Sequence, residues 1–227
     1  MATSSPDIFE SMKQAGKSLG LFAAIATSIV ALTFMLTETR IADNERQALL
    51  KSLHELIPSN RHDNDLNADF ILLDEPSLNY RNKPVTAYRA RLNEEPVAAI
   101  FNVTAPDGYT GAINLLVAIN VDNSIAGVRV VGHRETPGLG DAIEIEKSNW
   151  ITMFDGQSLT KKTENYWRVK KDGGQFDQLT GATITPRAIV KITKKTLQYF
   201  QENHDNVFHE TAKEAKETPN LELEKGN

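Results

Sequence analysis

The 227-residue chain contains no cysteine. This absence excludes disulfides, thiolate zinc sites, cysteine-ligated iron–sulfur clusters and haem attached through a CxxCH motif. The five histidines lack the HExxH spacing of a helical zinc site, so no metal site is predicted. Any redox activity would therefore depend on an organic cofactor.

The chain also lacks an excess of basic residues, and its net charge is -5. A protein that binds nucleic acid needs a basic surface to neutralise phosphates, so no nucleic-acid partner is predicted. The GxGxxG fingerprint of dinucleotide-binding domains is absent as well. A nicotinamide donor site within this chain is therefore not expected.

Charged residues are missing from residues 18–37, between Lys17 and Glu38. A helix of that length rises about 30 Å, which matches the hydrocarbon thickness of a bilayer. A buried helix of a soluble protein and a cleaved signal peptide are the alternatives. Signal peptides usually have shorter apolar regions and small residues at the cleavage site, whereas this run ends in Phe34-Met35-Leu36. We therefore predict an uncleaved transmembrane helix.

The lysines Lys13 and Lys17 flank the N-terminal end of this run. Positive residues favour the cytoplasmic side, so residues 1–17 are predicted to be cytoplasmic. Arg40 and Arg46 lie close to the opposite end and weaken this bias. The main domain is then extracytoplasmic, which means periplasmic if the source is a Gram-negative bacterium.

Beyond the membrane segment, the pattern predicts one α+β domain. A helix over 43–57 is expected to continue from the membrane span and to pack on the domain, within a connecting region of residues 38–95. Short runs rich in β-branched residues predict strands, and two longer runs predict helices. The expected strands are 86–92, 96–103, 113–119 and 125–131, the helices are 142–154 and 185–203, and residues 205–227 form a polar tail predicted to be disordered.

The most informative stretch is DQLTGATITP, residues 177–186. Its small pair, Gly181 and Ala182, would let a flat ligand approach the backbone. Three hydroxyls surround that pair, and a helix begins directly afterwards, with an N-terminus that favours an anion. These hydroxyls belong to Thr180, Thr183 and Thr185. A threonine-rich helix cap with a tight turn, in which Thr185 is the N-cap and Pro186 the first helical residue, explains the same residues without a ligand.

A second stretch, HRETPGLGD, occupies residues 133–141 and follows a predicted strand. Pro137-Gly138 provides a fixed turn with positive φ available, and Gly140 allows a further sharp bend. Loops that follow strands often contact ligands, although a purely structural turn is the alternative. His133 is expected to form hydrogen bonds within this loop.

These two stretches resemble the motifs of the FMN-binding domain family, Dxx(S/T)GAT and HxETPGLG. The GYTGAINLLV run from Gly108 resembles a strand of the same family. The resemblance implies an extracytoplasmic FMN-binding domain over residues 96–204. It also implies that FMN is joined covalently to Thr183 through a phosphoester, with Thr185 as the competing hydroxyl.

The resemblance assigns further residues to the flavin site. Around the phosphoester it places Thr180, Gly181, Ala182 and Thr185, and around the flavin ring it places Glu135, Thr136, Leu139 and Gly140. A threonine hydroxyl is a poor nucleophile at neutral pH, and the motif contains no histidine or lysine to activate it. The family accordingly uses a separate flavin transferase with Mg²⁺, and Asp177 is interpreted as part of the sequence that this enzyme recognises.

Within the family, the length and both motifs are most similar to the RnfG/RsxG group of the Rnf/Rsx ion-translocating electron transport complex. The NqrC group of the Na⁺-translocating NADH:quinone oxidoreductase is the alternative. The resemblance implies a non-catalytic electron-carrier subunit of a translocase in the bacterial inner membrane, where other membrane subunits are its partners. Electrons in that complex pass between ferredoxin and a nicotinamide. A stand-alone membrane-tethered flavoprotein and a scaffold without a cofactor are further alternatives.

Overall fold

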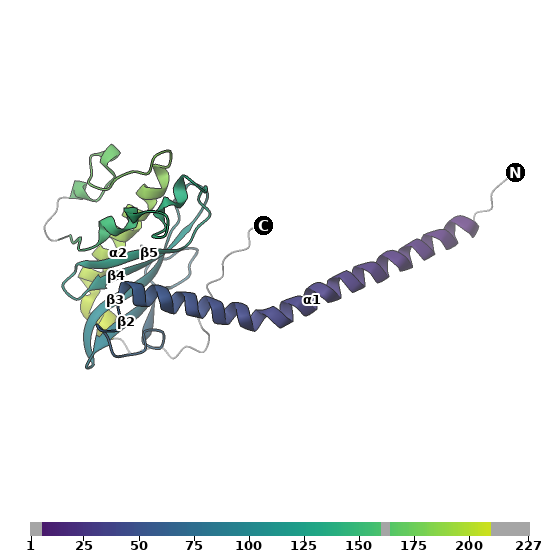
Figure 1. Cartoon of the computed structure of the whole chain (residues 1–227), viewed down its shortest axis with the longest axis horizontal. Helices are drawn as coiled ribbons and strands as arrows, with labels where there is room; N and C mark the ends of the chain where they lie inside the picture. Colours follow the sequence, from purple (N-terminus) through teal and green to yellow (C-terminus); the bar gives the residue numbers. More distant parts are fainter. Residues whose placement is uncertain (1–5, 160–163, 210–227) are drawn as a thin grey trace. The chain divides into compact units, whose positions relative to one another are not determined.

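The computed structural model describes residues 6–159 and 164–209. The chain divides into two units, residues 1–48 and residues 49–227, and each is described by itself. Helix α1, Pro6–Leu56, contributes its larger part to the first unit and its last turns to the second (Figure 1). The helix expected over 43–57 is therefore the C-terminal part of one continuous helix.

The first unit contains one stretch, Phe9–Glu38, that is long and apolar enough to cross a membrane by length and composition. The expected span of 18–37 lies inside it. Its hydroxyls return to the helix backbone: Ser28 Oγ donates to the Ala24 carbonyl at 2.7 Å, and Thr33 Oγ1 donates to the Ile29 carbonyl at 2.8 Å. Such internal hydrogen bonds make polar side chains tolerable in hydrocarbon, where water is absent.

The second unit is built on a five-stranded antiparallel sheet in the order β1-β2-β3-β4-β5. Every strand pairs with its neighbour in sequence, so the sheet is a simple meander. The strands are β1 Phe70–Leu73, β2 Val85–Leu92, β3 Glu95–Ala105, β4 Ile113–Asn120 and β5 Ile125–Gly132. The α+β class predicted from sequence is confirmed.

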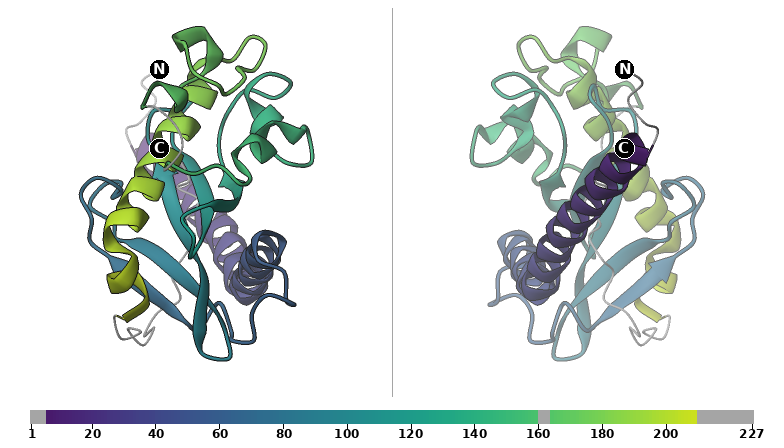
Figure 2. Two further views of the ribbon diagram at one scale, coloured as in Figure 1. Left: turned by 90° about the vertical axis from the view of Figure 1, so that its left-hand side faces the viewer. Right: turned by 90° about the vertical axis from the view of Figure 1, so that its right-hand side faces the viewer.

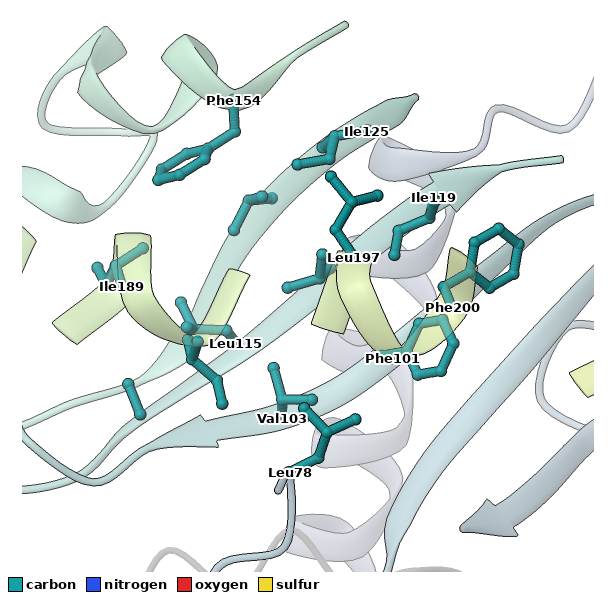
Figure 3. Packing of buried hydrophobic residues seen from close by; sticks show 14 of the residues in the cluster. Leu78, Phe101, Val103, Leu115, Ile119, Ile125, Phe154, Ile189, Leu197 and Phe200 are labelled. Atoms are coloured by element: carbon teal, nitrogen blue, oxygen red, sulfur yellow. The ribbon is translucent and has the colours of Figure 1, made fainter. Parts of the chain in front are cut away.

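Both faces of this sheet are buried, because alternate residues of each strand enter different hydrophobic clusters. In β3, Phe101 and Val103 pack beneath α2, Ile184–His209, which crosses one face (Figures 2 and 3). Ile100 enters the cluster on the other face, which includes Leu53 from the last turns of α1. Burial on both faces explains why the strands appear as nearly continuous apolar runs in the sequence.

Three elements differ from the sequence-based expectation. Strand β1 was not expected, because four apolar residues after a polar loop give little signal. The helix expected over 142–154 is replaced by two 3-10 helices, Gly140–Ile143 and Asn149–Phe154. Ser148 separates them in an extended conformation, with its hydroxyl donating to the Ala142 carbonyl and accepting from the Trp150 amide.

The third difference concerns the C-terminal tail. Helix α2 does not stop at residue 203, where Asn203 departs from helical geometry, but continues to His209. Val207 and Phe208 are buried in the main core, and this burial offsets the cost of the irregular residue. The first five residues of the tail that was expected to be disordered are therefore helical, and its remainder, 210–227, lies outside the described residues.

Candidate functional site

A tight turn precedes α2. The Ala182 amide donates to the Leu179 carbonyl at 3.1 Å, and Gly181 between them has a φ of +78°. Glycine adopts this conformation without the steric cost that a side chain brings. A Cβ on Gly181 would also lie 3.1 Å from Leu139 Cδ2. The turn therefore depends on glycine, and it brings the DQLTGAT segment against the HRETPGLGD loop.

Thr183 directly precedes Ile184, the first residue of α2, and is partly exposed. The first amides of a helix have no partner within the helix, and they form the positive end of its dipole. The first turn of α2 contains no acidic residue that would neutralise this end. An anionic group attached to Thr183 would therefore be stabilised by the helix.

Thr185 has a different environment from Thr183. It is fully buried, and its hydroxyl donates to a carboxylate oxygen of Glu135. Thr185 also lies within the first turn of α2 and not before it, so the expectation that it is the N-cap was wrong. The two hydroxyls that compete on sequence grounds are thus distinguished by burial and by an existing partner.

Glu135 is a buried carboxylate, 4% exposed, that connects three segments of the chain. One oxygen accepts from Thr185, and the other accepts from the Thr110 amide at 3.0 Å and lies 3.2 Å from its hydroxyl. A buried acceptor of this kind must be paired, because unsatisfied polar groups are costly in the interior. Glu135 therefore holds the 106–112 loop, its own loop and the start of α2 together.

Two glycines allow the segments to approach Glu135 closely. A Cβ on Gly140 would lie 2.9 Å from Glu135 Cβ and 3.3 Å from Thr185 Oγ1. A Cβ on Gly108 would lie 2.1 Å from the Gly111 carbonyl oxygen and 3.0 Å from Glu135 Oε1. Neither position has room for a side chain, so both glycines are part of the same packed junction.

The HRETPGLGD loop is fixed by its own hydrogen bonds. His133 Nδ1 accepts from the Glu135 amide at 3.0 Å, which leaves the proton of the neutral ring on Nε2 to be donated to Glu144 Oε1 at 2.8 Å. The Thr136 carbonyl accepts from the amides of Leu139 and Gly140, at 3.2 and 3.0 Å. The prediction that His133 forms hydrogen bonds within this loop is therefore confirmed.

An ion cluster fixes the far end of the same loop. Lys147 Nζ lies 2.8 Å from Asp141 Oδ2 and 2.9 Å from Glu144 Oε1. The hydrogen bond from Lys147, followed by the backbone amide of Gly138, holds the pKa of Asp141 below its usual range. Lys147 likewise lowers the pKa of Glu144, and hydrogen bonds to both carboxylates raise the pKa of Lys147.

Large apolar side chains are exposed in each of the three segments that Glu135 connects. Leu139 is 46% exposed, Tyr109 is 67% exposed and Ile184 is 44% exposed. Exposed large apolar residues in adjoining segments mark a surface suited to a flat apolar ligand. Two of the three lie close to Thr183: Ile184 follows it in sequence, and Leu139 Cδ2 lies 3.1 Å from the position of a Cβ on Gly181.

The remaining expected site residues lie on the surface of these loops. Thr136 and Thr180 are exposed, and Ala182 is partly buried. The Asp177 carboxylate is half exposed and pairs with Lys170 at 2.5 Å, while its carbonyl accepts from the Trp150 indole at 2.7 Å. Asp177 therefore makes no contact with the Glu135 junction among these interactions, and its half-exposed carboxylate can be reached by another protein.

Sequence reasoning missed the contributions of Thr110, Ile184 and Lys170. Thr110 follows Tyr109 in a run that was identified as a strand of the family, but its contact with Glu135 depends on the pairing of β4 with β5. No short-range pattern encodes such a contact. Ile184 could have been recognised as a large apolar residue directly after the motif, at the start of the predicted helix.

Comparison with known proteins matches two family models to this chain. Residues 108–198 match the FMN-binding domain, and residues 1–56 match the RnfG N-terminal region. The first match includes both motifs and the Glu135 junction. The second covers the apolar helix and ends where α1 ends.

Curated relatives match most of the chain. A protein of Pseudoalteromonas atlantica is 46% identical over 193 residues, which cover 85% of this chain and 90% of the relative. A protein of Vibrio cholerae is 42% identical over 199 residues, covering 88% and 95%. A protein of Pseudomonas aeruginosa is 47% identical over 189 residues, covering 83% and 88%. Each is named as the G component of an ion-translocating oxidoreductase complex, and the chain belongs to this RnfG family.

Proposed function

We propose that this chain is the RnfG-type electron-transfer subunit of an ion-translocating oxidoreductase complex, and that it carries FMN as a phosphoester on Thr183. The family membership and the FMN-binding domain support the electron-transfer role. The names of the relatives favour this assignment over the NqrC component of the Na⁺-translocating NADH:quinone oxidoreductase. The other membrane subunits of the complex are then its partners.

The position of Thr183 is the observation that carries the cofactor proposal. Thr183, a partly exposed residue, stands at the N-terminus of α2, and the competing hydroxyl of Thr185 is buried against Glu135. A phosphodiester retains a negative charge, which the helix N-terminus stabilises. The residues present therefore fit a phosphate-linked group at position 183.

The ring system of FMN fits the exposed apolar side chains beside that position. Leu139, Tyr109 and Ile184 would lose exposed surface to a flat aromatic group, which is favourable by about 25 cal/mol per Å² of apolar area. Bound FMN supplies the capacity to accept and donate electrons. The protein contributes position and environment: it holds the phosphate end on α2 and shields one side of the ring from water.

Attachment requires a separate flavin transferase in this proposal. The Thr183–phosphorus bond forms as the pyrophosphate bond of FAD breaks, AMP leaves, and the hydroxyl proton passes to a base. His133 is unsuited to be that base, since both ring nitrogens are engaged with Glu135 and Glu144. The Asp177 carboxylate is half exposed, so the transferase can reach it by displacing its surface ion pair with Lys170.

The proposal places the flavin domain outside the cytoplasm. Lys13 and Lys17 precede the apolar stretch of α1, and positive residues remain on the cytoplasmic side. The chain is then a single-pass protein of the bacterial inner membrane with its N-terminus inside. Its flavin is held near the cofactors of neighbouring subunits by the anchor.

Replacement of Thr183 by valine tests the attachment site. Valine has nearly the same shape as threonine but cannot form the ester, so protein produced with a flavin transferase should lose its fluorescent band on a denaturing gel. The intact mass of the variant should be lower than that of the loaded wild-type chain by the whole attached FMN, that is, by FMN less one water. Thr152→Val, at a partly exposed threonine outside both motifs, is the matched control and should remain fluorescent.

Two outcomes would count against the proposal in different ways. A fluorescent Thr183→Val chain would show that another residue is the acceptor. A wild-type chain that is colourless and of unmodified mass, although the transferase was present and active on another substrate, would exclude covalent FMN.

A further inference from the structure

Positive charge is concentrated around the flavinylation motif, although the chain as a whole is acidic. Residues 161–195 contain nine lysines and arginines and three acidic residues, whereas the net charge of the whole chain is -5. The basic residues lie on both sides of the motif in sequence. Such segregation is a property of surfaces that meet a charged partner.

The structure gathers part of this charge in one groove of about 530 Å³ between residues 167–172 and α2. Five cationic side chains and one carboxylate, Asp172, line it, together with the buried apolar residues Val169 and Val190. The cationic residues are Arg168, Arg187, Lys191, Lys194 and Lys195. Those on α2 occupy positions 187, 191, 194 and 195, which fall within about 100° of the helix circumference at 3.6 residues per turn and so share one side of the helix.

Two acidic residues balance part of this charge. Arg187 binds Asp172 through two contacts of 2.6 Å, and Lys191 lies 2.5 Å from Asp107. The hydrogen bond from Arg187 lowers the pKa of Asp172, so this carboxylate is ionised when the pair forms. Five cations against the two carboxylates of Asp172 and Asp107 still leave the groove with a net positive charge.

The groove adjoins the proposed flavin attachment site. Arg187 lies four residues after Thr183, and its amide approaches the Thr183 carbonyl at 3.5 Å. Lys170, in the turn that forms the other wall, pairs with Asp177 of the motif. A partner in the groove would therefore lie beside residue 183.

We propose that this groove is the docking site for an acidic segment of another subunit of the complex, one that exchanges electrons with the flavin. The inference depends on the proposed function and adds the partner surface to it. Complementary charge at a docking surface raises the rate of productive encounter and fixes its orientation. A segment bound here would be held next to the flavin attachment site.

The extent of the groove favours a protein segment over a small anion. From Arg187 to Lys195 the cations span nine residues of helix, whose eight steps rise about 12 Å at 1.5 Å per residue. A single phosphate group is too short to face all of them, whereas several carboxylates along a chain segment can do so. The apolar floor of Val169 and Val190 suits the aliphatic parts of such a segment.

A photocrosslinking experiment on the full chain in native membranes tests the inference. Gln198, exposed and lining the groove, is replaced by the photoreactive residue benzoylphenylalanine. Irradiation should give an adduct with another subunit of the complex, and mass spectrometry should locate it in a segment rich in Asp and Glu. Adding Lys194→Glu and Lys195→Glu should lower the adduct yield about fivefold or more, because the attraction becomes repulsion.

The matched control is the double charge reversal Lys51→Glu and Lys83→Glu, which makes the same change in net charge at exposed positions outside the groove. It should leave the yield within about twofold, as expected for substitutions away from a docking surface. No adduct, an adduct with lipid alone, or equal yields from both double variants would overturn the inference. In-gel flavin fluorescence of the same samples reports the proposed function separately, since a fluorescent chain without an adduct contradicts only the docking site.

Discussion

At the scale of single residues, Glu135 is the contact on which the site geometry depends. Glu135→Ala would leave the Thr185 hydroxyl and the Thr110 amide without their acceptor in the interior. Because an unsatisfied buried group costs about 1–3 kcal/mol, we expect the free energy of unfolding to fall by at least that amount. Chemical denaturation monitored by circular dichroism measures it.

The control for this substitution is Glu146→Ala, which removes an exposed carboxylate six residues after Gly140. A surface change of this kind should alter stability by no more than about 0.5 kcal/mol. Glu135→Gln should be intermediate, since the amide retains one acceptor oxygen. Equal stability of the two alanine variants would mean that the junction contributes nothing to folding.

The residues of the site could be predicted only in part from the sequence. The motif indicated both Thr183 and Thr185 as candidate acceptors, and the residues around them were found by resemblance. Their difference in burial could not be predicted, because it arises from Glu135, which lies 50 residues away in sequence. The expected role of Glu135 beside the flavin ring stays a prediction, and its carboxylate is buried with both oxygens engaged, by Thr185 and Thr110.

At the scale of elements, the turn before α2 depends on one backbone conformation. Gly181→Ala would force an alanine to a φ of +78°, which costs about 1 kcal/mol for an L-residue. It would also place a Cβ 3.1 Å from Leu139 Cδ2. We expect reduced stability and slower flavin loading, measured by thermal unfolding and by in-gel fluorescence over time.

Gly156→Ala separates these two effects. Gly156 has a φ of +70°, but a Cβ there would meet nothing within 4 Å. It should therefore show the conformational cost alone and leave flavin loading unchanged. Adding Leu139→Ala to Gly181→Ala should restore the share of stability and loading rate that is lost through the contact with Leu139. If nothing is restored, the loss arises from the backbone conformation alone.

The loop that includes Glu135 should become less stable in acid. Lys147 lowers the pKa of Asp141 and Glu144 in the folded state. A carboxyl with a lowered folded pKa stabilises the protein above its unfolded pKa, and this stabilisation is lost as the pH falls through the folded value. The loss should therefore occur below about pH 4, where carboxyls ordinarily titrate.

Comparison of the wild-type chain with Lys147→Met tests this assignment. The difference in melting temperature should be largest near neutral pH and should shrink in strong acid, because the carboxylates are then protonated in both proteins. Lys51→Met, at an exposed position, should give a small difference at all pH values. A constant difference for Lys147→Met would contradict the role of the ion cluster.

Elements with strong local patterns were predicted well, and those set by tertiary contacts were not. The four expected strands lie within two residues of β2 to β5, because their apolar and β-branched runs are bounded by clear turns. The helix expected over 142–154 failed because Ser148 forms hydrogen bonds that interrupt it. The continuation of α2 depends on the burial of Phe208. This burial could not be predicted, because the neighbouring residues in the sequence are mostly polar.

At the scale of the whole molecule, the proposal requires the two ends of the apolar helix to lie on opposite sides of a membrane. The lack of cysteine makes this directly measurable, since a single introduced cysteine is the only thiol in the chain. Ser11 precedes the expected span, and Ser77 is an exposed residue of the second unit. Ser11→Cys and Ser77→Cys therefore report on opposite ends.

In spheroplasts, a membrane-impermeant maleimide should label Ser77→Cys at once and Ser11→Cys only after the membrane is broken. The reason is that Lys13 and Lys17 hold the N-terminal end on the cytoplasmic side, where the reagent cannot reach it. The reverse pattern would place the flavin domain in the cytoplasm. A cleaved signal peptide would give a third pattern, because the mature chain would lack residue 11 and the Ser11→Cys variant would remain unlabelled even after lysis. The same two variants therefore distinguish an uncleaved anchor from a cleaved signal peptide and determine the orientation of the chain.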